Sequence, residues 1–395
     1  MSLFLIIFLA IYGSANGYFF LKARTAASLA GIGTPVLTLF LATMVAAPIL
    51  VRTLERAGHE SAARLAAYIG YCWMGFLFLF VVAAALLDLC RLTTRLAGVV
   101  VGRELPLPLG GTAGFLLPFS LAIGISIYGW FEALNIRQEQ VTLVSSKLPP
   151  GIERLRIVLI SDVHIGLIVR EERLRLMIAK VREAAPDILI STGDLVDGHV
   201  SHFNGISGLL REVRPRYGAF AVPGNHEYYV GIDQAIAFTE RAGFTILRGG
   251  STEVAGLITI AGVDDPAAGR FGTTLLKKEN SLLSPLARNR FTLFLKHRPV
   301  VDPSSVGLFD LQLSGHVHKG QIFPFNLLTY LNFPVHAGLT RLSAESGLYV
   351  SRGTGTWGPP IRFLSPPEVT VIDLVPAKQE KFSSARRTTG TTPNK

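Results

Sequence analysis

The first third of the 395-residue chain contains four long stretches without a single Asp, Glu, Lys or Arg. These stretches are Met1 to Leu21, Thr25 to Val51, Leu65 to Leu87 and Leu105 to Phe131. A helix needs about 20 apolar residues to cross the hydrocarbon core of a bilayer, and each stretch is long enough. Buried core helices are the alternative, but the crowding of the four stretches at one end favours transmembrane helices. We expect a membrane domain over residues 1–135, with helices at about residues 1–21, 26–51, 65–89 and 113–131.

The first stretch lacks the basic n-region of a signal peptide, and its segment "GSANG" meets the signal-cleavage rule only loosely. We therefore interpret this stretch as a retained membrane helix. Four spans place both chain ends on one side of the membrane. Lys and Arg near the span ends number five on each side, so the positive-inside rule does not choose an orientation.

The net charge is +10, but no dense basic stripe with interleaved aromatic residues is present, so we expect no nucleic-acid partner. An anionic membrane surface or a phosphorylated substrate fits this charge at least as well. The two cysteines, Cys72 and Cys90, both lie in or beside the third stretch. The rest of the chain therefore has neither a thiolate metal site nor a cysteine nucleophile.

After the membrane domain the pattern changes. Residues 136–153 are polar, contain Pro149-Pro150-Gly151, and indicate a linker with one short strand. From residue 154 to about 375, short apolar runs alternate with amphipathic helices, which is typical of stacked α and β layers. The remaining residues, 376–395, carry few apolar groups, and we expect them to be disordered.

Polar side chains follow five of the predicted strands at the point where each strand ends. They are Asp162 and His164 in "SDVH", Asp194 in "TGDLVDG", Asn225 and His226 in "PGNHEY", His297 in "KHRP", and His316 and His318 in "GHVH". Open α/β sheets bind ligands outside the carboxyl ends of their strands, so we expect these side chains at one edge.

This set offers nitrogen and oxygen donors without sulfur, which suits Mn, Fe or Zn, and it is large enough for two ions. Two ions need a bridging carboxylate, and Asp194 is the natural candidate because it stands alone on its strand. In such sites the ions lie about 3.5–4 Å apart and lower the pKa of a water between them. His316 and His318 are two residues apart, so in an extended segment they face one side and can serve adjacent ions.

The blocks "DVH", "GDLVDG", "GNHE", "KH" and "GHVH" resemble the five motifs of the calcineurin-like metallophosphoesterase family over about residues 154–375. Flanking segments such as "LPPGIERLRIVLISDVHIG" and "GHVHKGQ" resemble the bacterial branch in which membrane helices precede the phosphoesterase domain. The resemblance implies an α/β fold: a four-layer α/β/β/α sandwich with a dimetal site at one edge.

The resemblance also implies residue roles. Asp162, His164 and His318 would hold the first ion, Asn225, His297 and His316 the second, and Asp194 would bridge them. His226 would be the catalytic general acid for the leaving oxygen, or would donate a hydrogen bond in the transition state. Gly198 stands where protein Ser/Thr phosphatases of the superfamily carry arginine, which makes a phosphoprotein substrate a poor expectation. Lys319 stands where many relatives have glycine and is either a substrate contact or solvated. His336 is a second candidate at the pocket mouth.

The resulting hypothesis is an integral enzyme of the bacterial inner membrane that hydrolyses a phosphodiester or pyrophosphate bond by metal-hydroxide attack. Tethering at the bilayer favours a lipid-linked substrate, and similar enzymes cleave UDP-2,3-diacylglucosamine. Relatives that carry secretion signals favour the extracytoplasmic side for the catalytic domain. The alternatives are a non-catalytic membrane interaction protein and a metal-dependent sensor of phosphorylated ligands.

Overall fold

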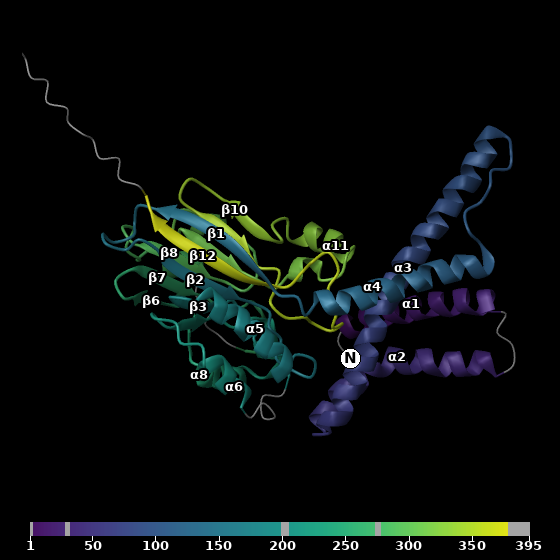
Figure 1. Cartoon of the computed structure of the whole chain (residues 1–395), viewed down its shortest axis with the longest axis horizontal. Helices are drawn as coiled ribbons and strands as arrows, with labels where there is room; N and C mark the ends of the chain where they lie inside the picture. The colour runs from purple at the N-terminus through teal and green to yellow at the C-terminus, as the bar shows by residue number, and fades with distance from the viewer. Residues whose placement is uncertain (1–2, 28–31, 199–204, 273–277, 378–395) are drawn as a thin grey trace, which may run out of the picture.

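The computed structural model describes residues 3–27, 32–198, 205–272 and 278–377. The chain forms a group of long helices at one end and a two-sheet sandwich at the other (Figure 1). Most of the predicted disordered tail, from residue 378 onward, lies outside the described residues.

Four helices form the first part of the chain, and all are long and apolar enough to cross a membrane. They are α1 (Leu3–Ala27), α2 (Gly33–Arg56), α3 (Glu60–Val101) and α4 (Gly111–Glu132). Helix α3 has 42 residues and is about 63 Å long, roughly twice the thickness of a hydrocarbon core. It crosses the other three at a steep angle (Figure 1). It extends past the uncharged stretch at both ends because Arg64, Arg91 and Arg95 are good helix formers, and it ends at the left-handed Gly102.

The first sheet has the strand order β1-β12-β2-β3-β4-β5. Its strands are β1 (Arg137–Ser145), β12 (Glu368–Pro376), β2 (Leu155–Ile160), β3 (Ile188–Ser191), β4 (Ala219–Ala221) and β5 (Phe244–Ile246). Strands β2 to β5 are parallel, β12 is antiparallel to β2, and β1 is parallel to β12. The segment expected to be a linker thus supplies a nine-residue edge strand, because its backbone pairs with the far end of the chain.

The second sheet has the order β10-β11-β9-β8-β7-β6. Its strands are β6 (Gly250–Val254), β7 (Ile258–Gly262), β8 (Phe291–Leu295), β9 (Leu311–Ser314), β10 (Gly338–Arg341) and β11 (Gly347–Val350). Strands β7, β8, β9 and β11 are parallel, while β6 and β10 are antiparallel edges.

The predicted α/β sandwich is confirmed, because the two mixed sheets share one apolar core. Ile157 and Leu159 of β2 pack there with Leu293 and Leu295 of β8. The alternate residues of β2 pack instead against the outer helices. These helices are α5 (Glu171–Ala184), α6 (Ile206–Arg211) and α8 (Ile232–Arg241). The remaining short helices are α7 (Asn225–Val230), α9 (Ala267–Arg270), α10 (Glu279–Leu283) and α11 (Phe325–Asn332).

The long helices pack directly against the sandwich. The backbone N–H of Arg362 donates to the carbonyl of Gly129 in α4 at 2.9 Å. Ile322 and Ile361 belong to the same apolar cluster as Leu77 and Phe80 of α3. The guanidinium of Arg173 in α5 lies 5.0 Å from the ring centre of Trp130 in α4. These contacts come from two loop segments and from α5, and they hold this edge of the sandwich against the helices.

Candidate metal centre

The eight side chains predicted at strand ends meet at one edge of the sandwich. Two follow β2, one follows β3, two open α7 directly after β4, one follows β8, and two follow β9. All are buried except His316, which is half-buried. Carboxylate, amide and imidazole groups from five separate strands are therefore concentrated at this edge, away from bulk water.

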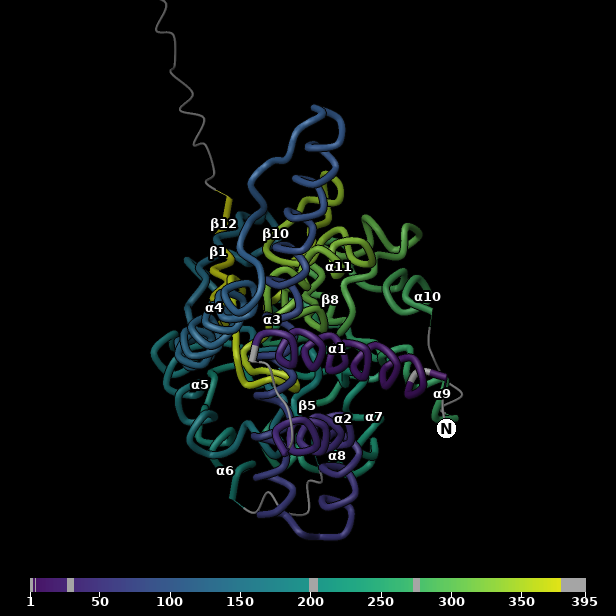
Figure 2. Tube along the Cα trace, turned by 90° about the vertical axis from the view of Figure 1, so that its right-hand side faces the viewer, coloured from purple at the N-terminus to yellow at the C-terminus, as the bar shows by residue number. Residues whose placement is uncertain are grey.

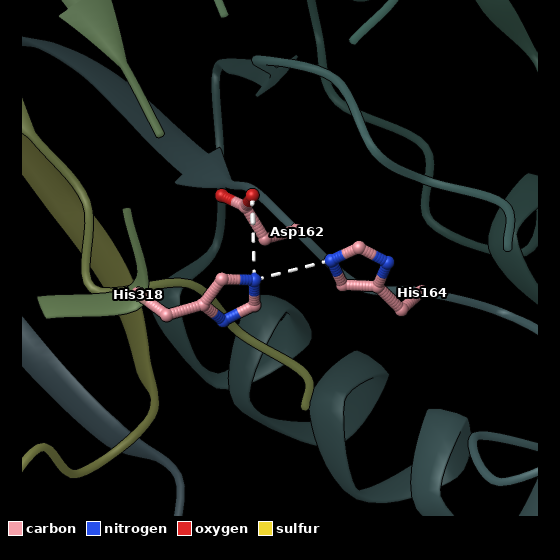
Figure 3. A group of neighbouring side chains, drawn as sticks. All are labelled: Asp162, His164 and His318. Carbon is pink, nitrogen blue, oxygen red and sulfur yellow. Dashed lines mark hydrogen bonds and ion pairs between the residues drawn. The ribbon is translucent and has the colours of Figure 1, made fainter. Parts of the chain in front are cut away.

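Three of these side chains form a first cluster, Asp162, His164 and His318, drawn in Figure 3. The Nε2 atoms of His164 and His318 are 3.1 Å apart. His318 Nε2 lies 3.6 Å from Asp162 Oδ1. One ligand atom from each residue lies within 4.8 Å of the others, which is close enough for all three to bind a single ion.

A second cluster, Asp194, His297 and His316, lies beside the first, and its Asp194 carboxylate also approaches His164 of the first cluster. Asp194 Oδ2 is 3.1 Å from His297 Nε2 and 3.9 Å from His164 Nε2. His297 Nε2 is also 3.2 Å from His316 Nδ1 and 3.2 Å from Asn225 Oδ1. Asp194 thus lies between the two groups, where a bridging ligand is expected.

The backbone around the site is strained. Five of the predicted ligands adopt the left-handed conformation that non-glycine residues avoid: Asp162, His164, Asp194, His316 and His318. Each such residue costs on the order of 1–3 kcal/mol. Neighbouring glycines allow the close approach, because a Cβ on Gly224 would lie 2.2 Å from Asp194 Oδ1 and one on Gly315 1.9 Å from Ser161 Oγ. The surrounding structure therefore keeps these five residues in a strained backbone conformation, which fixes the geometry of their side chains.

The electrostatics of three of the four imidazoles in the two clusters favour the neutral form. Burial lowers the pKa of His164 to about 4 and that of His316 to about 3, and burial also lowers the pKa of His318. His297 differs: burial opposes its protonation, but Asp194 outweighs burial and raises its pKa to about 10. Neutral imidazole is the form that binds metal.

Two further observations show that the donor set fits divalent cations. The Nε2 atoms of His164 and His297 both lie near Asp194 Oδ2, at 3.9 and 3.1 Å. Asp162 and Asp194 are buried carboxylates, with at most 2% of their surface exposed. Buried negative charges and converging nitrogen lone pairs need a cation, and oxygen and nitrogen ligands without sulfur suit Mn, Fe or Zn.

His226 is held at the edge of both clusters. Its Nδ1 lies 2.5 Å from Asp197 Oδ1, and its backbone N–H donates to Asp194 Oδ1 at 2.8 Å. Burial would lower the pKa of His226, but Asp197 and Asp194 together raise it to about 9. Its ring lies edge-on to His164, 4.7 Å between centroids, and 5.7 Å from the half-exposed Trp357.

Lys319 and His336 were the candidate substrate contacts, with a solvated side chain as the alternative for Lys319. Lys319 follows His318 directly and is half-buried. In the described part of the chain no hydrogen bond or ion pair is recorded for its ammonium group. His336 packs edge-on against Tyr330 of α11, with ring centroids 5.6 Å apart, and belongs to none of the clusters.

Two buried residues around the site were not singled out from the sequence. Glu227, inside the quoted "GNHE", accepts hydrogen bonds from the backbone N–H groups of Asp194, Val196 and Gly224, and so ties α7 to the turn after β3. Arg362 is fully buried, and its Nη2 lies 3.1 Å from His318 Nδ1. The motif contained the signal for Glu227, whereas nothing local marked Arg362, which is 44 residues from His318.

The fold and this edge define a metallophosphoesterase. Residues 155–320 match the family described as calcineurin-like phosphoesterase. A metallophosphoesterase of Aquifex aeolicus (strain VF5) is 37% identical over 256 residues, which cover 64% of this chain and 97% of the relative. The chain belongs to the calcineurin-like metallophosphoesterase family.

The chain is also similar to two other proteins. A Danio rerio transmembrane protein with metallophosphoesterase domain is 31% identical over 263 residues, which cover 63% of this chain and 60% of the relative. The structure of a 5'-nucleotidase precursor from Thermus thermophilus aligns with a TM-score of 0.34 at 14% identity. That alignment covers 56% of this chain and 54% of the nucleotidase.

Proposed function

We propose that the chain is a membrane-anchored dimetal phosphoesterase that hydrolyses a phosphodiester or pyrophosphate bond. The observation that carries the proposal is the Asp194 carboxylate between two ligand clusters, with His226 beside both. The first position uses Asp162, His164 and His318, and the second uses Asn225, His297 and His316. Two divalent ions bound there would polarise the phosphoryl oxygens and lower the pKa of a water between them.

The side chains of the protein supply the remaining chemistry. Asp197 holds the Nδ1 side of His226, which leaves Nε2 available to donate a proton to the leaving oxygen. Trp357 packs near this ring and can form one wall for the leaving group. Lys319, with its ammonium group unpaired among the described residues, is placed to approach a substrate phosphate as a point charge.

Asp194→Asn and His226→Ala test the mechanism, with Asp233→Asn on the exposed face of α8 as the control. Each protein is reconstituted with Mn, Fe or Zn and assayed with a chromogenic phosphodiester. Asp194→Asn should lower kcat/KM beyond the roughly 10–100-fold that loss of an outer-shell partner costs. Full activity in both site variants would exclude the mechanism, and binding without product in the parent protein would favour the sensor.

A lipid-linked substrate is the finer part of the proposal. The site edge is held against α3 and α4, and a cavity of about 350 Å³ opens there. It is lined by Cys72, Ser126, Ile127, Trp130, Phe131 and Ile361. Ile361 precedes Arg362, whose Nη2 lies 3.1 Å from His318 Nδ1, so an acyl chain in this cavity would contact the loop that supports His318.

Cellular measurements test the substrate and the compartment. Lipid extracts from a deletion strain should accumulate a phospholipid or a nucleotide-linked lipid such as UDP-2,3-diacylglucosamine, and an unchanged lipid profile would argue against this class. We place the catalytic domain on the extracytoplasmic side, and a reporter fused to the C-terminus should be active only outside the cytoplasm.

A further inference from the structure

A fifth stretch without Asp, Glu, Lys or Arg lies inside the phosphoesterase domain, from Gly320 to Thr340. It begins two residues after His318 and contains α11. Of the eight residues of α11, only Thr329 is buried. Five large apolar or aromatic side chains of this helix are exposed, from 48% for Phe325 to 76% for Leu331; the other three are Leu327, Leu328 and Tyr330.

This exposure differs from that of the rest of the sandwich. Elsewhere on its described surface, most large exposed apolar side chains are dispersed, such as Val144, Leu176 and Val300. On α11 they follow one another over two turns, with Phe323 immediately before the helix. A contiguous apolar patch on a protein surface marks a binding or membrane-contact site. The exposed surface of α11 therefore resembles that of α1 to α4.

The apolar surface of α11 is continuous with the membrane helices. The ring of Phe325 packs edge-on against Phe78 of α3, with centroids 6.2 Å apart. Ile322, three residues earlier, lies in the cluster that includes Leu77 and Phe80 of α3. Both views place α11 beside α3 (Figures 1 and 2). Phe78 lies inside the third uncharged stretch, so α11 contacts a residue expected within the bilayer.

We propose that α11 is embedded in the bilayer leaflet that adjoins the metal centre, lying along the membrane interface without crossing it. An eight-residue helix is about 12 Å long, too short for a span but sufficient for an interfacial helix. Lys319, at the start of the uncharged stretch, then lies at the depth of the phosphate headgroups, where anionic lipid attracts it.

This placement deepens the proposed function and rests on it for its catalytic consequence. His316 and His318 lie on the same turn that leads into α11, so an embedded α11 brings the site edge to headgroup depth. A phosphoester in a lipid headgroup could then reach the site while its acyl chains stay in the leaflet. The substrate class is a diacyl lipid phosphodiester or pyrophosphate presented by the membrane.

The placement is tested first with a depth probe. Cys72→Ser and Cys90→Ser remove the native thiols, and Leu331→Cys is labelled with an NBD fluorophore in phosphatidylcholine–phosphatidylglycerol vesicles. Leu176→Cys on α5, also exposed, is the matched control. Spin-labelled lipids should quench the probe at position 331 at least about twofold and leave that at position 176 unchanged. Equal quenching at both positions, or a cross-link between two copies through position 331, would overturn the proposal.

A second measurement keeps the native cysteines and uses Leu328→Glu with Leu331→Glu. We expect kcat/KM for a diacyl phosphodiester in vesicles to fall at least about tenfold, and that for a soluble chromogenic phosphodiester to stay unchanged. A fall in kcat/KM for both substrates, or for neither of them, would overturn the inference. A parent protein that hydrolyses neither substrate would contradict the proposed function, whereas the quenching result would still decide the placement of α11.

Discussion

The two halves of the metal edge are supported by different parts of the molecule. The first half, Asp162, His164 and His318, is enclosed by the loop that carries Arg362. This loop bonds to Gly129 of α4 and packs on α3 through Ile361. The second half is supported within the sandwich, where Arg298, next to His297, pairs with the buried Asp265 at 2.7 Å.

The difference shows which half the membrane helices can influence. Arg362 donates to the carbonyls of His318, Arg352, Gly355 and Ser365, so the position of His318 depends on a loop that α4 holds in place. No such chain of contacts leads from Arg298 to α1–α4 among the described residues. We therefore expect changes in the membrane domain to affect the first ion position more than the second.

Removing one imidazole from each half has the largest expected effect. His318→Ala and His316→Ala should each lower kcat/KM by at least about 100-fold, because each deletes a predicted ligand. Each purified variant should retain one ion of two, measured by elemental analysis. His59→Ala, an exposed histidine before α3, is the control for metal content. Loss of both ions from either variant would show that the two halves do not bind metal separately.

The supporting arginines provide the next test. Arg362→Met and Arg298→Met should each lower the free energy of unfolding by on the order of 3 kcal/mol, because buried carbonyls or a buried carboxylate lose their partner. Thermal unfolding in detergent measures this loss. Metal titration should then separate the variants, with Arg362→Met weakening the first position and Arg298→Met the second. If both arginine variants weaken binding at the same ion position, the two halves are not supported separately.

The contact between α4 and the Arg362 loop allows a more local perturbation. A Cβ at Gly129 would lie 2.9 Å from the Arg362 carbonyl oxygen, whereas a Cβ at Gly124 of the same helix meets nothing within 4 Å. Gly129→Val should displace the loop and weaken binding at the first ion position about tenfold, a loss typical of outer-shell changes. Gly124→Val should leave both positions unchanged. If Gly129→Val and Gly124→Val weaken metal binding equally, the contact between α4 and the Arg362 loop does not influence the first ion position.

The sequence predicted the site edge well because its motifs are local. Each block places a polar side chain directly after an apolar strand, and parallel strands bring their carboxyl ends together. The contacts missed by sequence reasoning join distant residues. Pairing of β1 with β12 links residues 137–145 to 368–376, and Arg362 reaches His318 from a loop with no metal-binding motif.

The full length of α3 and the exposed helix α11 were not predicted from the sequence, for a different reason. We expected the third helix to end near residue 89, but α3 continues through Arg91 and Arg95 because arginine is a good helix former. The stretch from Gly320 to Thr340 contains two prolines and several Asn, Gln and Thr residues, so it does not resemble a span. Only the structure shows that α11 lies beside α3 and that, among the described residues, most of its large apolar side chains stay exposed.

The smallest expected effect comes from an ion pair that lies outside both halves of the metal edge. Arg156 of β2 and Asp373 of β12 pair across the sheet, with Nη2 and Oδ2 2.7 Å apart. The hydrogen bond from Arg156 lowers the pKa of Asp373 below its ordinary 3.8. A lowered folded-state pKa gives stability that is present above pH 3.8 and is lost as the pH falls through the folded value.

Asp373→Asn should therefore lower the free energy of unfolding by about 1 kcal/mol at pH 7 and by almost nothing near pH 2. Denaturant unfolding at both pH values measures this difference. Activity and the metal content of both halves should stay at parent levels, and a change in either ion would show that strand pairing, as well as the Arg362 loop, controls the site.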